Sequence, residues 1–313
     1  MSAPGRVCPL RYRYGAQAIA NAPERHAETL YVIGGLYGNP QSLAAVEAMA
    51  CAEPGPVTLC FNGDFNWFNI DDAGFRAINE GVLKHDAILG NVEAELGEDS
   101  DTAGCGCAYP ESVDQGVVER SNQIHARLKR TAARHPDLLD RLSALPMLAR
   151  YRVSAARIGV VHGDADSLAG WRFDPAALDD PSGHAWRAAA FAMARADVFA
   201  STHTCAAGMR RFDLDGVKLV ANNGAAGMPN ARNARFGTLT RIGAKPSPHA
   251  GLYGHVVQNV HVDALAIGYD DAAWQRCFLD NWPAGSPAWL SYYARISQGP
   301  EYQLQTAAEL AAA

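Results

Sequence analysis

The sequence predicts a mixed α/β sandwich, and three observations support that prediction. Along residues 30–205 a unit recurs: a short apolar run rich in β-branched residues, a small polar or glycine-rich turn, and then a helix-like stretch. Polar residues follow the predicted strands, where open α/β sheets place their ligand sites. After residue 215, apolar runs separated by Gly, Pro and Asn have the character of consecutive antiparallel strands.

The predicted elements follow in chain order. The first strand, 30–33, leads through a glycine-rich turn into a helix over 40–50, with Asn39 as its N-cap and Pro40 at its first position. Further strands with polar turns after them are predicted at 57–61, 87–89, 158–161 and 198–200. Strands of antiparallel character are predicted at 216–221, 237–242 and 256–267. Amphipathic spacing predicts a long helix over 113–134, which continues after Pro136 over 137–145.

Composition and charge narrow the classes of function. With 48% hydrophobic and 19% charged residues, 313 residues can bury a substantial core, and no repeat or linker divides them, so we expect one domain over 1–313. The net charge of -6 and a pI near 5.9 disfavour a surface that coats nucleic acid. The N-terminal segment has no apolar stretch of the signal-peptide kind, and no apolar run approaches the roughly 18 residues of a membrane span. We therefore expect a cytoplasmic protein.

Five short segments follow predicted strands and carry chemically useful side chains. They are Gly35-Leu36-Tyr37, Gly63-Asp64, Gly90-Asn91-Val92-Glu93, His162-Gly163 and Thr202-His203-Thr204-Cys205, with a glycine-rich segment at 222–229 after them. In this order and strand context, the series resembles the motifs of the calcineurin-like metallophosphoesterases, particularly their compact bacterial branch. The resemblance implies a four-layer α/β/β/α sandwich of two mixed sheets, with a motif core over about 30–245 and further strands and a helix over 250–313. It also implies a site for divalent metal ions.

The resemblance divides the site into a retained half and a lost half. It implies that the ligands of the second metal all remain, as Asp64, Asn91, His162 and His203. The ligands unique to the first metal are missing, because Gly35 and Tyr37 stand where the family has Asp and His, and Cys205 replaces the second His of the last motif. A carboxylate, an amide and two imidazoles suit Zn, Mn or Fe. We therefore expect one ion rather than two.

The same losses bear on catalysis. The two-metal mechanism uses both ions to generate a hydroxide and to hold the phosphoryl oxygens, whereas one ion can still lower the pKa of a bound water to about 7. Val92 stands where the family has the His that assists the leaving group, and its side chain cannot donate a proton. Candidates for a replacement acid, chosen only because they lie close to the motifs in sequence, are Glu93, Asp164, His184 and Tyr37.

Thiols and arginines are further candidates for the site. Cys205 holds the position of a first-metal ligand, and the resemblance places Cys105 and Cys107 in a loop on the side where substrates enter. Three converging thiolates would suit a soft ion such as Zn or Fe, but Cys-x-Cys lacks the Cys-x₂-Cys spacing of zinc knuckles, which favours incidental thiols. Arg210 and Arg211 could pair with a phosphate, although paired arginines usually face solvent.

Two functions from different classes follow. The leading hypothesis is a metal-dependent hydrolase of a phosphate ester or anhydride that acts on a small phosphorylated substrate. The alternative is a protein that kept the fold, lost catalysis, and binds a metal or another ligand or senses a redox state; a partner-binding role is third. Metal analysis together with turnover assays separates them. The substrate, the identity and number of the ions and the oligomeric state stay open at this level.

Overall fold

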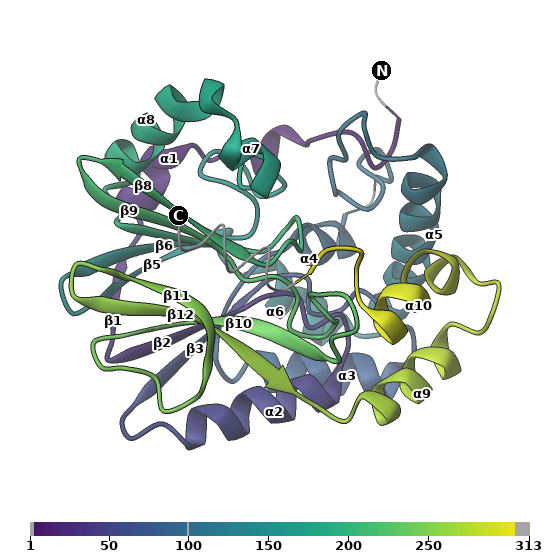
Figure 1. Ribbon diagram of the computed structural model, residues 1–313. Coiled ribbons are helices and arrows are strands. Elements are labelled where there is room, and N and C mark those ends of the chain that lie inside the picture. The colour runs from purple at the N-terminus through teal and green to yellow at the C-terminus, as the bar shows by residue number, and fades with distance from the viewer. Residues whose placement is uncertain (1–2, 99, 304–313) are drawn as a thin grey trace.

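Two six-stranded sheets lie face to face in the computed structural model, which describes residues 3–98 and 100–303 (Figure 1). The last part of the predicted C-terminal segment, 304–313, lies outside the described residues. In sheet order β11-β12-β10-β2-β3-β4, one sheet contains β11 (Gly251–Val257), β12 (Val260–Gly268), β10 (Phe236–Gly243), β2 (Thr29–Ile33), β3 (Val57–Asn62) and β4 (Asp86–Ile88). In order β1-β5-β6-β7-β9-β8, the other contains β1 (Glu24–Ala27), β5 (Leu148–Val153), β6 (Ala156–Val161), β7 (Val198–Ser201), β9 (Gly216–Asn222) and β8 (Gly208–Leu214).

Both sheets are mixed, and each contains three adjacent parallel strands, which include the edge strand β4 in one sheet and are central in the other. Strands β2, β3 and β4 are parallel to one another, and so are β6, β7 and β9. Antiparallel strands flank them: β10 pairs with β2 on one sheet, and β5 and β8 pair with β6 and β9 on the other. Because parallel strands end at the same edge, the turns after β3, β4, β6 and β7 gather at one end of the sandwich.

Helices cover the outer face of each sheet, so the molecule has four layers (Figure 1). An apolar cluster on the β2–β3 side contains residues of α2 (Pro40–Cys51), α3 (Asp72–Val82), α4 (Asn91–Leu96), α5 (Gln115–Ala132), α6 (Pro136–Ser143), α9 (Asp271–Asn281) and α10 (Pro287–Gln298). The cluster on the β6–β7 side contains residues of α1 (Ala16–Asn21), α7 (Pro175–Asp179) and α8 (His184–Ala194). The short helical turns η1 (Leu10–Tyr12) and η2 (Pro181–Gly183) complete the set. This arrangement confirms the predicted four-layer α/β/β/α sandwich.

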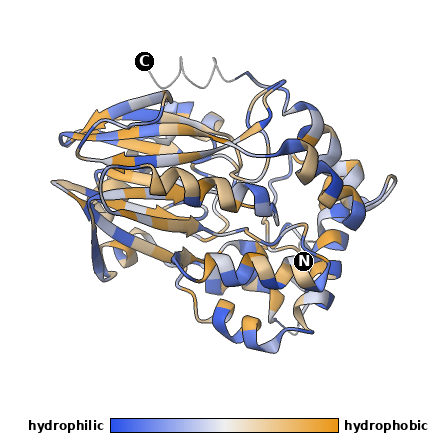
Figure 2. Ribbon diagram, turned by 90° about the horizontal axis from the view of Figure 1, so that it is seen from below, coloured by the Kyte–Doolittle hydropathy of each residue, from blue (hydrophilic) through white to orange (hydrophobic). Residues whose placement is uncertain are grey.

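The strands are buried on both faces, which explains their unbroken apolar runs. In β2, Leu30 and Val32 belong to the cluster between the two sheets, whereas Tyr31 and Ile33 belong to the cluster beneath the helices. Figure 2 shows apolar residues concentrated on the strands, while the helices alternate between apolar and polar residues. None of the helices in the described ranges is both long and apolar enough to cross a bilayer.

The local signals for α2 and α5 are confirmed. The side chain of Asn39 accepts a hydrogen bond from the backbone N–H of Ser42 at 3.0 Å, and Pro40 occupies the first turn of the helix. Helix α5 begins after Asp114, whose carboxylate caps its first turn, so it lies within the predicted 113–134 range.

The prediction of one strand over 256–267 is wrong. The segment is the end of a hairpin: β11 ends at Val257, β12 begins at Val260, and the two residues between them turn the chain. Gln258 and Asn259 have φ values of 50° and 61°, which is the left-handed pair of a type I′ turn. Neither residue is Gly or Pro, and the only sign of the turn in the sequence is two consecutive polar residues between Val257 and Val260.

Candidate metal centre

The four predicted ligands of the second metal come from turns at the same end of the sandwich. Asp64 follows β3, and Asn91 opens α4 just after β4, so one sheet supplies a carboxylate and an amide. His162 follows β6 and His203 follows β7, so the opposite sheet supplies two imidazoles. All four residues are at most 8% exposed. The site therefore bridges the two sheets.

Two glycines allow the turns after β3 and β4 to touch. A Cβ atom on Gly63 would lie 2.3 Å from the backbone nitrogen of Gly90, and a Cβ on Gly90 would lie 2.2 Å from Oδ1 of Asp64. Gly63 and Asp64 both adopt positive φ, 79° and 54°, a conformation that Gly and Asp tolerate better than most residues. The backbone N–H of Val92 then donates to Oδ1 of Asp64 at 3.2 Å. The glycines of the Gly-Asp and Gly-Asn motifs are therefore both needed for the close contact between the turns after β3 and β4.

Backbone carbonyls fix the proton positions of both histidines. Nδ1 of His162 lies 2.7 Å from the carbonyl oxygen of Asn62, and Nε2 of His203 lies 3.0 Å from that of Cys107. Because a carbonyl can only accept, each of these ring nitrogens carries the proton. The other nitrogen of each ring, Nε2 of His162 and Nδ1 of His203, is left with a free lone pair, and these two atoms are 3.2 Å apart. Such an outer hydrogen bond is typical of metal-binding histidines.

Oxygen acceptors complete the cluster. Asn91 donates through Nδ2 to the carbonyl oxygen of Cys105 at 2.9 Å, which turns its Oδ1 inward to 3.1 Å from Nε2 of His162. Oδ2 of Asp64 lies 3.4 Å from the same nitrogen. The ligand atoms of Asp64, His162 and His203 all lie within 4.8 Å of one another. Four acceptor atoms therefore face one another with their protons directed outward, an arrangement that a divalent cation would stabilise.

Without an ion, the Asp64 carboxylate favours a second proton on His162, which a metal ion would have to displace. Burial opposes the ionisation of His162, but the adjacent Asp64 carboxylate outweighs burial and raises the pKa of that imidazole. Burial and the neighbouring His162 lower the pKa of His203 to about 4, so His203 stays neutral near pH 7. Burial would raise the pKa of Asp64, but His162 and the other neighbours lower it, so the carboxylate is ionised. A neutral imidazole and a carboxylate are the states that bind a metal.

A tyrosine ring occupies the space beside Gly35, where the sequence predicts that a metal ligand is missing. A Cβ atom on Gly35 would lie 2.5 Å from Cζ of Tyr37, so the ring occupies the space that a side chain at position 35 would take. The Tyr37 hydroxyl contacts Sγ of Cys205 at 2.6 Å. Burial raises the pKa of both groups, which keeps the phenol and the thiol protonated. This half of the site offers no charged ligand.

The thiols do not form a ligand cluster. Cys107 and Cys205 line the same pocket, whereas Cys105 is fully buried and contributes its backbone carbonyl to the orientation of Asn91. In the described part of the chain, the group of converging His, Cys, Asp and Glu side chains consists of Asp64, His162 and His203 and includes no cysteine.

The two carboxylates considered as acids hold loops in place. Oε2 of Glu93 accepts from the N–H of Asp64 at 2.7 Å and Oε1 accepts from the N–H of Asn66, while burial and the Asp64 charge raise the pKa of Glu93 to about 7. Asp164 accepts from the N–H groups of Asp166, Ser167 and Arg172. Neither residue lines the pocket beside the ligands. Both act on the cluster through the backbone.

The remaining sequence candidates lie elsewhere. Arg210 pairs with Asp179 at 2.6 Å, and Arg211 pairs with Asp213 at 2.7 Å. His184 is the first residue of α8. None of these three candidates is among the residues that line the pocket.

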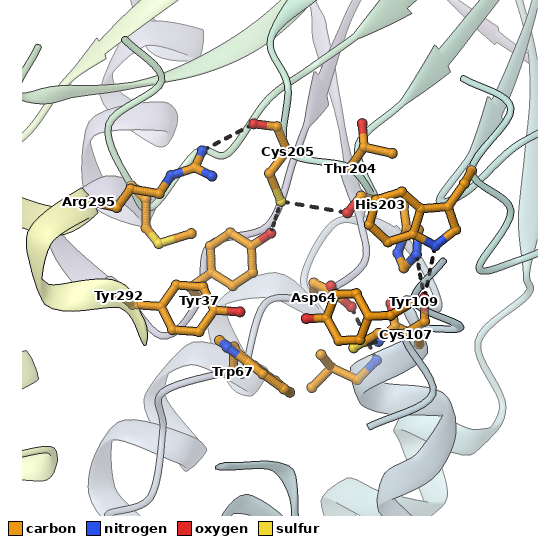
Figure 3. Close-up of a pocket in the computed structure, with 14 residues that line it drawn as sticks. Tyr37, Asp64, Trp67, Cys107, Tyr109, His203, Thr204, Cys205, Tyr292 and Arg295 are labelled. Atoms are coloured by element: carbon orange, nitrogen blue, oxygen red, sulfur yellow. Dashed lines mark hydrogen bonds between the residues drawn. The ribbon is translucent and has the colours of Figure 1, made fainter. Parts of the chain in front are cut away.

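The pocket beside the ligands is lined by residues that the motifs did not indicate. It has a volume of about 150 Å³ and opens between Asp64, His203 and Tyr37 (Figure 3). Its lining also includes four aromatic residues and one guanidinium outside the motifs, namely Trp67, Tyr109, Trp171, Tyr292 and Arg295. Trp171 donates to the Cys107 carbonyl and packs edge-on against the His203 ring. Tyr292 and Arg295 are spaced i, i+3 on α10, and that spacing was the only local signal that they share a face.

Comparison with known proteins supports the fold. No protein-family model matches the sequence, and no curated protein matches it. The crystal structure of a metallophosphoesterase from Sphaerobacter thermophilus matches with a TM-score of 0.55 and 16% identity, covering 87% of this chain and 100% of that one. A hypothetical protein from Pyrococcus horikoshii OT3 matches with a TM-score of 0.58 and 15% identity, covering 87% and 99%. The chain therefore has the metallophosphoesterase fold that its motif series predicted.

Proposed function

We propose that the protein is a metal-dependent hydrolase of phosphate esters or anhydrides that works with a single divalent ion. The observation that supports the proposal is the convergence of four acceptor atoms from Asp64, Asn91, His162 and His203, whose protons are all directed away from the centre. Three kinds of donor atom at this spacing fit Zn, Mn or Fe. Tyr37 fills the position of a second ion, so the site has room for one.

The residues around the ion have separate tasks. The ion itself would lower the pKa of a bound water and polarise a phosphoryl oxygen. His162 and His203 keep their inner nitrogens free of protons, and Asn91 is held by the Cys105 carbonyl with its oxygen inward. Trp171 and Tyr109 line the pocket next to His203 and limit the access of bulk water.

Leaving-group chemistry sets the expected substrates. Val92 lines the pocket where the resemblance implies a proton donor, and it has none to give. The Tyr37 hydroxyl faces the same pocket, but burial raises its pKa well above the usual value, which makes it a hydrogen-bond donor and a poor acid. We therefore infer that substrates with good leaving groups, such as aryl phosphates and phosphoanhydrides, react faster than alkyl phosphates.

Turnover assays test the proposal. Purified protein is assayed with an aryl phosphomonoester, an aryl phosphodiester and a nucleoside triphosphate in the presence of Mn, Zn, Fe or Mg. We expect hydrolysis with at least one metal, and its loss in Asp64→Ala. Asp179→Asn, which alters a carboxylate paired with Arg210 away from the pocket, serves as the matched control and should keep full activity. Flat traces with every metal would exclude the hydrolase.

A metal-binding protein without turnover is the second candidate. Val92 and the Tyr37 ring favour it, since together they remove the proton donor and the second ion that the family mechanism uses. Elemental analysis after dialysis distinguishes it from the hydrolase. About one equivalent of metal per chain, lost in His203→Ala and accompanied by no turnover, supports this candidate. Metal-free protein that binds no added metal contradicts both.

A further inference from the structure

Arg295 is an arginine without an anionic partner, and it lies at the edge of the pocket. Its Nη2 donates to the carbonyl oxygen of Cys205 at 3.1 Å, and its Nε donates to that of Pro229 at 3.2 Å. Nη1 donates to neither a carbonyl nor a carboxylate among the described residues. Arg210 and Arg241 each pair with a carboxylate, whereas Arg187, like Arg295, donates only to backbone carbonyls among the described residues but does not line the pocket. The positive charge of Arg295 is therefore not neutralised within the described ranges.

The groups that face this guanidinium are neutral. Tyr37, Tyr292 and Tyr302 lie close to it, and burial raises the pKa of each phenol above its usual value. Two backbone carbonyls orient the guanidinium but carry no net charge. Arg295 is half-buried, and a cation partly withdrawn from water without a counter-ion is costly, so such a position favours an anion that arrives from outside.

The guanidinium lies on the side of the pocket where the first-metal ligands are missing. Arg295, Tyr37, Cys205 and Asp64 line one cavity, and Figure 3 shows the Tyr37 hydroxyl and the Cys205 thiol between Arg295 and Asp64. A metal ion held by Asp64, Asn91, His162 and His203 would therefore give the cavity a second positive centre besides Arg295. A small tetrahedral anion that enters the cavity meets both.

We propose that Arg295 binds a phosphoryl group of the substrate and supplies the positive charge that a second metal ion would otherwise provide. The planar guanidinium presents parallel N–H donors that match two oxygens of one phosphoryl group. It cannot generate a hydroxide, so its task is to hold the anion while the metal side activates water. The ligand class that fits is a terminal phosphoryl group with two or more free oxygens, as in a monoester or at the end of an anhydride. This inference rests on the proposed hydrolase.

Titration with inorganic phosphate tests the inference without turnover. Calorimetry is carried out on the full-length protein, loaded with Mn²⁺ and metal-free, for the wild type, Arg295→Gln and Arg295→Lys. Gln keeps a donor for the Cys205 carbonyl and removes the charge. We expect phosphate affinity about 10- to 100-fold weaker in Arg295→Gln, the usual effect of losing a charge-assisted hydrogen bond, with unchanged Mn²⁺ content. The phosphate affinity of Arg295→Lys should lie between those of the wild type and Arg295→Gln, because lysine keeps the positive charge but lacks the parallel N–H donors of the guanidinium.

Arg120→Gln is the matched control. Arg120 also contacts α10, through Ser291, and it has no carboxylate partner among the described residues, but it does not line the pocket. Its loss should leave phosphate affinity unchanged. Wild-type affinity in a folded Arg295→Gln, or a wild type that binds no phosphate, would overturn the inference. If Arg295→Gln does not fold, wild-type affinity in Arg295→Lys overturns it instead.

Kinetics and metal analysis distinguish this inference from the proposed function. With an aryl phosphate, Arg295→Gln should raise KM by the same factor as it weakens phosphate binding, with a smaller change in kcat, because the contact exists before and during the reaction. If the hydrolase proposal fails, no variant turns over, yet phosphate binding to the metal-free protein still depends on Arg295. If only the inference fails, Asp64→Ala abolishes turnover while Arg295→Gln binds phosphate like the wild type.

Discussion

Gly35 and Tyr37 show, at the scale of single residues, how one missing side chain changes what a site can hold. The absence of a Cβ at Gly35 makes room for the Tyr37 ring, which lies within 2.5 Å of where that Cβ would be. Tyr37 itself adopts a φ of 54°, a conformation that bulky residues rarely take. The ring contacts Cys205 and packs 6.0 Å from the Phe68 ring. These contacts support the strained conformation.

A double-mutant cycle tests this coupling. We expect Gly35→Ala to lower the free energy of unfolding by about 1–3 kcal/mol, because the new methyl group overlaps the Tyr37 ring and either the ring or the backbone must shift. In a Tyr37→Ala background the same substitution should cost much less, since the ring is gone. Urea denaturation of the four proteins gives the interaction energy.

Gly97→Ala is the control for that cycle, because a Cβ on Gly97 would meet no atom within 4 Å. It should change the free energy of unfolding by about 0.5 kcal/mol or less. Additive effects of Gly35→Ala and Tyr37→Ala would show that the ring does not occupy the space beside Gly35.

A buried ion pair connects two elements on the helical side of the β2 sheet. Glu53 lies just after α2 and Arg241 lies within β10, with Oε1 and Nε 2.6 Å apart and both side chains 1% exposed. The Tyr31 hydroxyl also donates to Glu53, at 2.7 Å. The pair therefore fixes the end of α2 against two neighbouring strands. Removing one partner leaves the other charge buried.

Glu53→Ala tests the strength of this connection. We expect the free energy of unfolding to fall by about 3 kcal/mol, the lower end of the range for breaking a buried pair, because Asp263 lies 3.7 Å from Arg241 and remains as a weaker partner. Asp213→Ala, which breaks the exposed pair with Arg211, is the control and should cost about 1 kcal/mol or less. Equal losses of unfolding free energy in Glu53→Ala and Asp213→Ala would show that the buried pair stabilises the fold no more than the exposed pair does.

The same pair predicts a pH dependence. Burial alone would raise the pKa of Glu53, but hydrogen bonds from Arg241 and Tyr31 outweigh it and lower that pKa below its ordinary value of 4.5. The unfolded chain then binds the proton more readily than the folded chain at acid pH. We expect the difference in unfolding free energy between wild type and Glu53→Gln to be constant above about pH 4.5 and to shrink as pH falls below it. A difference that does not change between pH 6 and pH 3 would contradict the lowered pKa.

At the scale of the whole molecule, the candidate metal centre lies between the two sheets. Asp64 and Asn91 follow strands of one sheet, and His162 and His203 follow strands of the other. An ion held by all four would connect the sheets at the end where their apolar interior meets the pocket. Unfolding separates these ligands, so the ion binds the folded chain in preference to the unfolded one.

Metal should therefore raise the stability of the protein. With free Mn²⁺ at 100 times its Kd, we expect the free energy of unfolding to increase by about 2.7 kcal/mol and the increase to disappear after chelation. His162→Ala should show a much smaller metal-dependent shift, because it removes the most central donor. Calorimetric unfolding with and without metal measures both. An equal shift in wild type and His162→Ala would mean that the ion binds elsewhere.

The sequence by itself determined the fold class and the candidate ligands. Apolar runs, the Asn39 cap and the glycine turns are local signals, and the order of the motifs placed Asp64, Asn91, His162 and His203 on strand ends that meet in one sandwich. These local signals can be recognised although the sequence is only 15–16% identical to the compared structures, because each signal depends on a few neighbouring residues.

Only the tertiary structure decided what fills the rest of the site. Whether Tyr37 covers Gly35, and whether Arg295 reaches the pocket from α10, depends on how elements distant in sequence pack. The turn at Gln258 and Asn259 was missed although Asn often occurs in turns, because it is only two residues long and contains neither Gly nor Pro. Side-chain contacts between remote segments follow from packing in three dimensions, and a periodic pattern along one chain does not specify them.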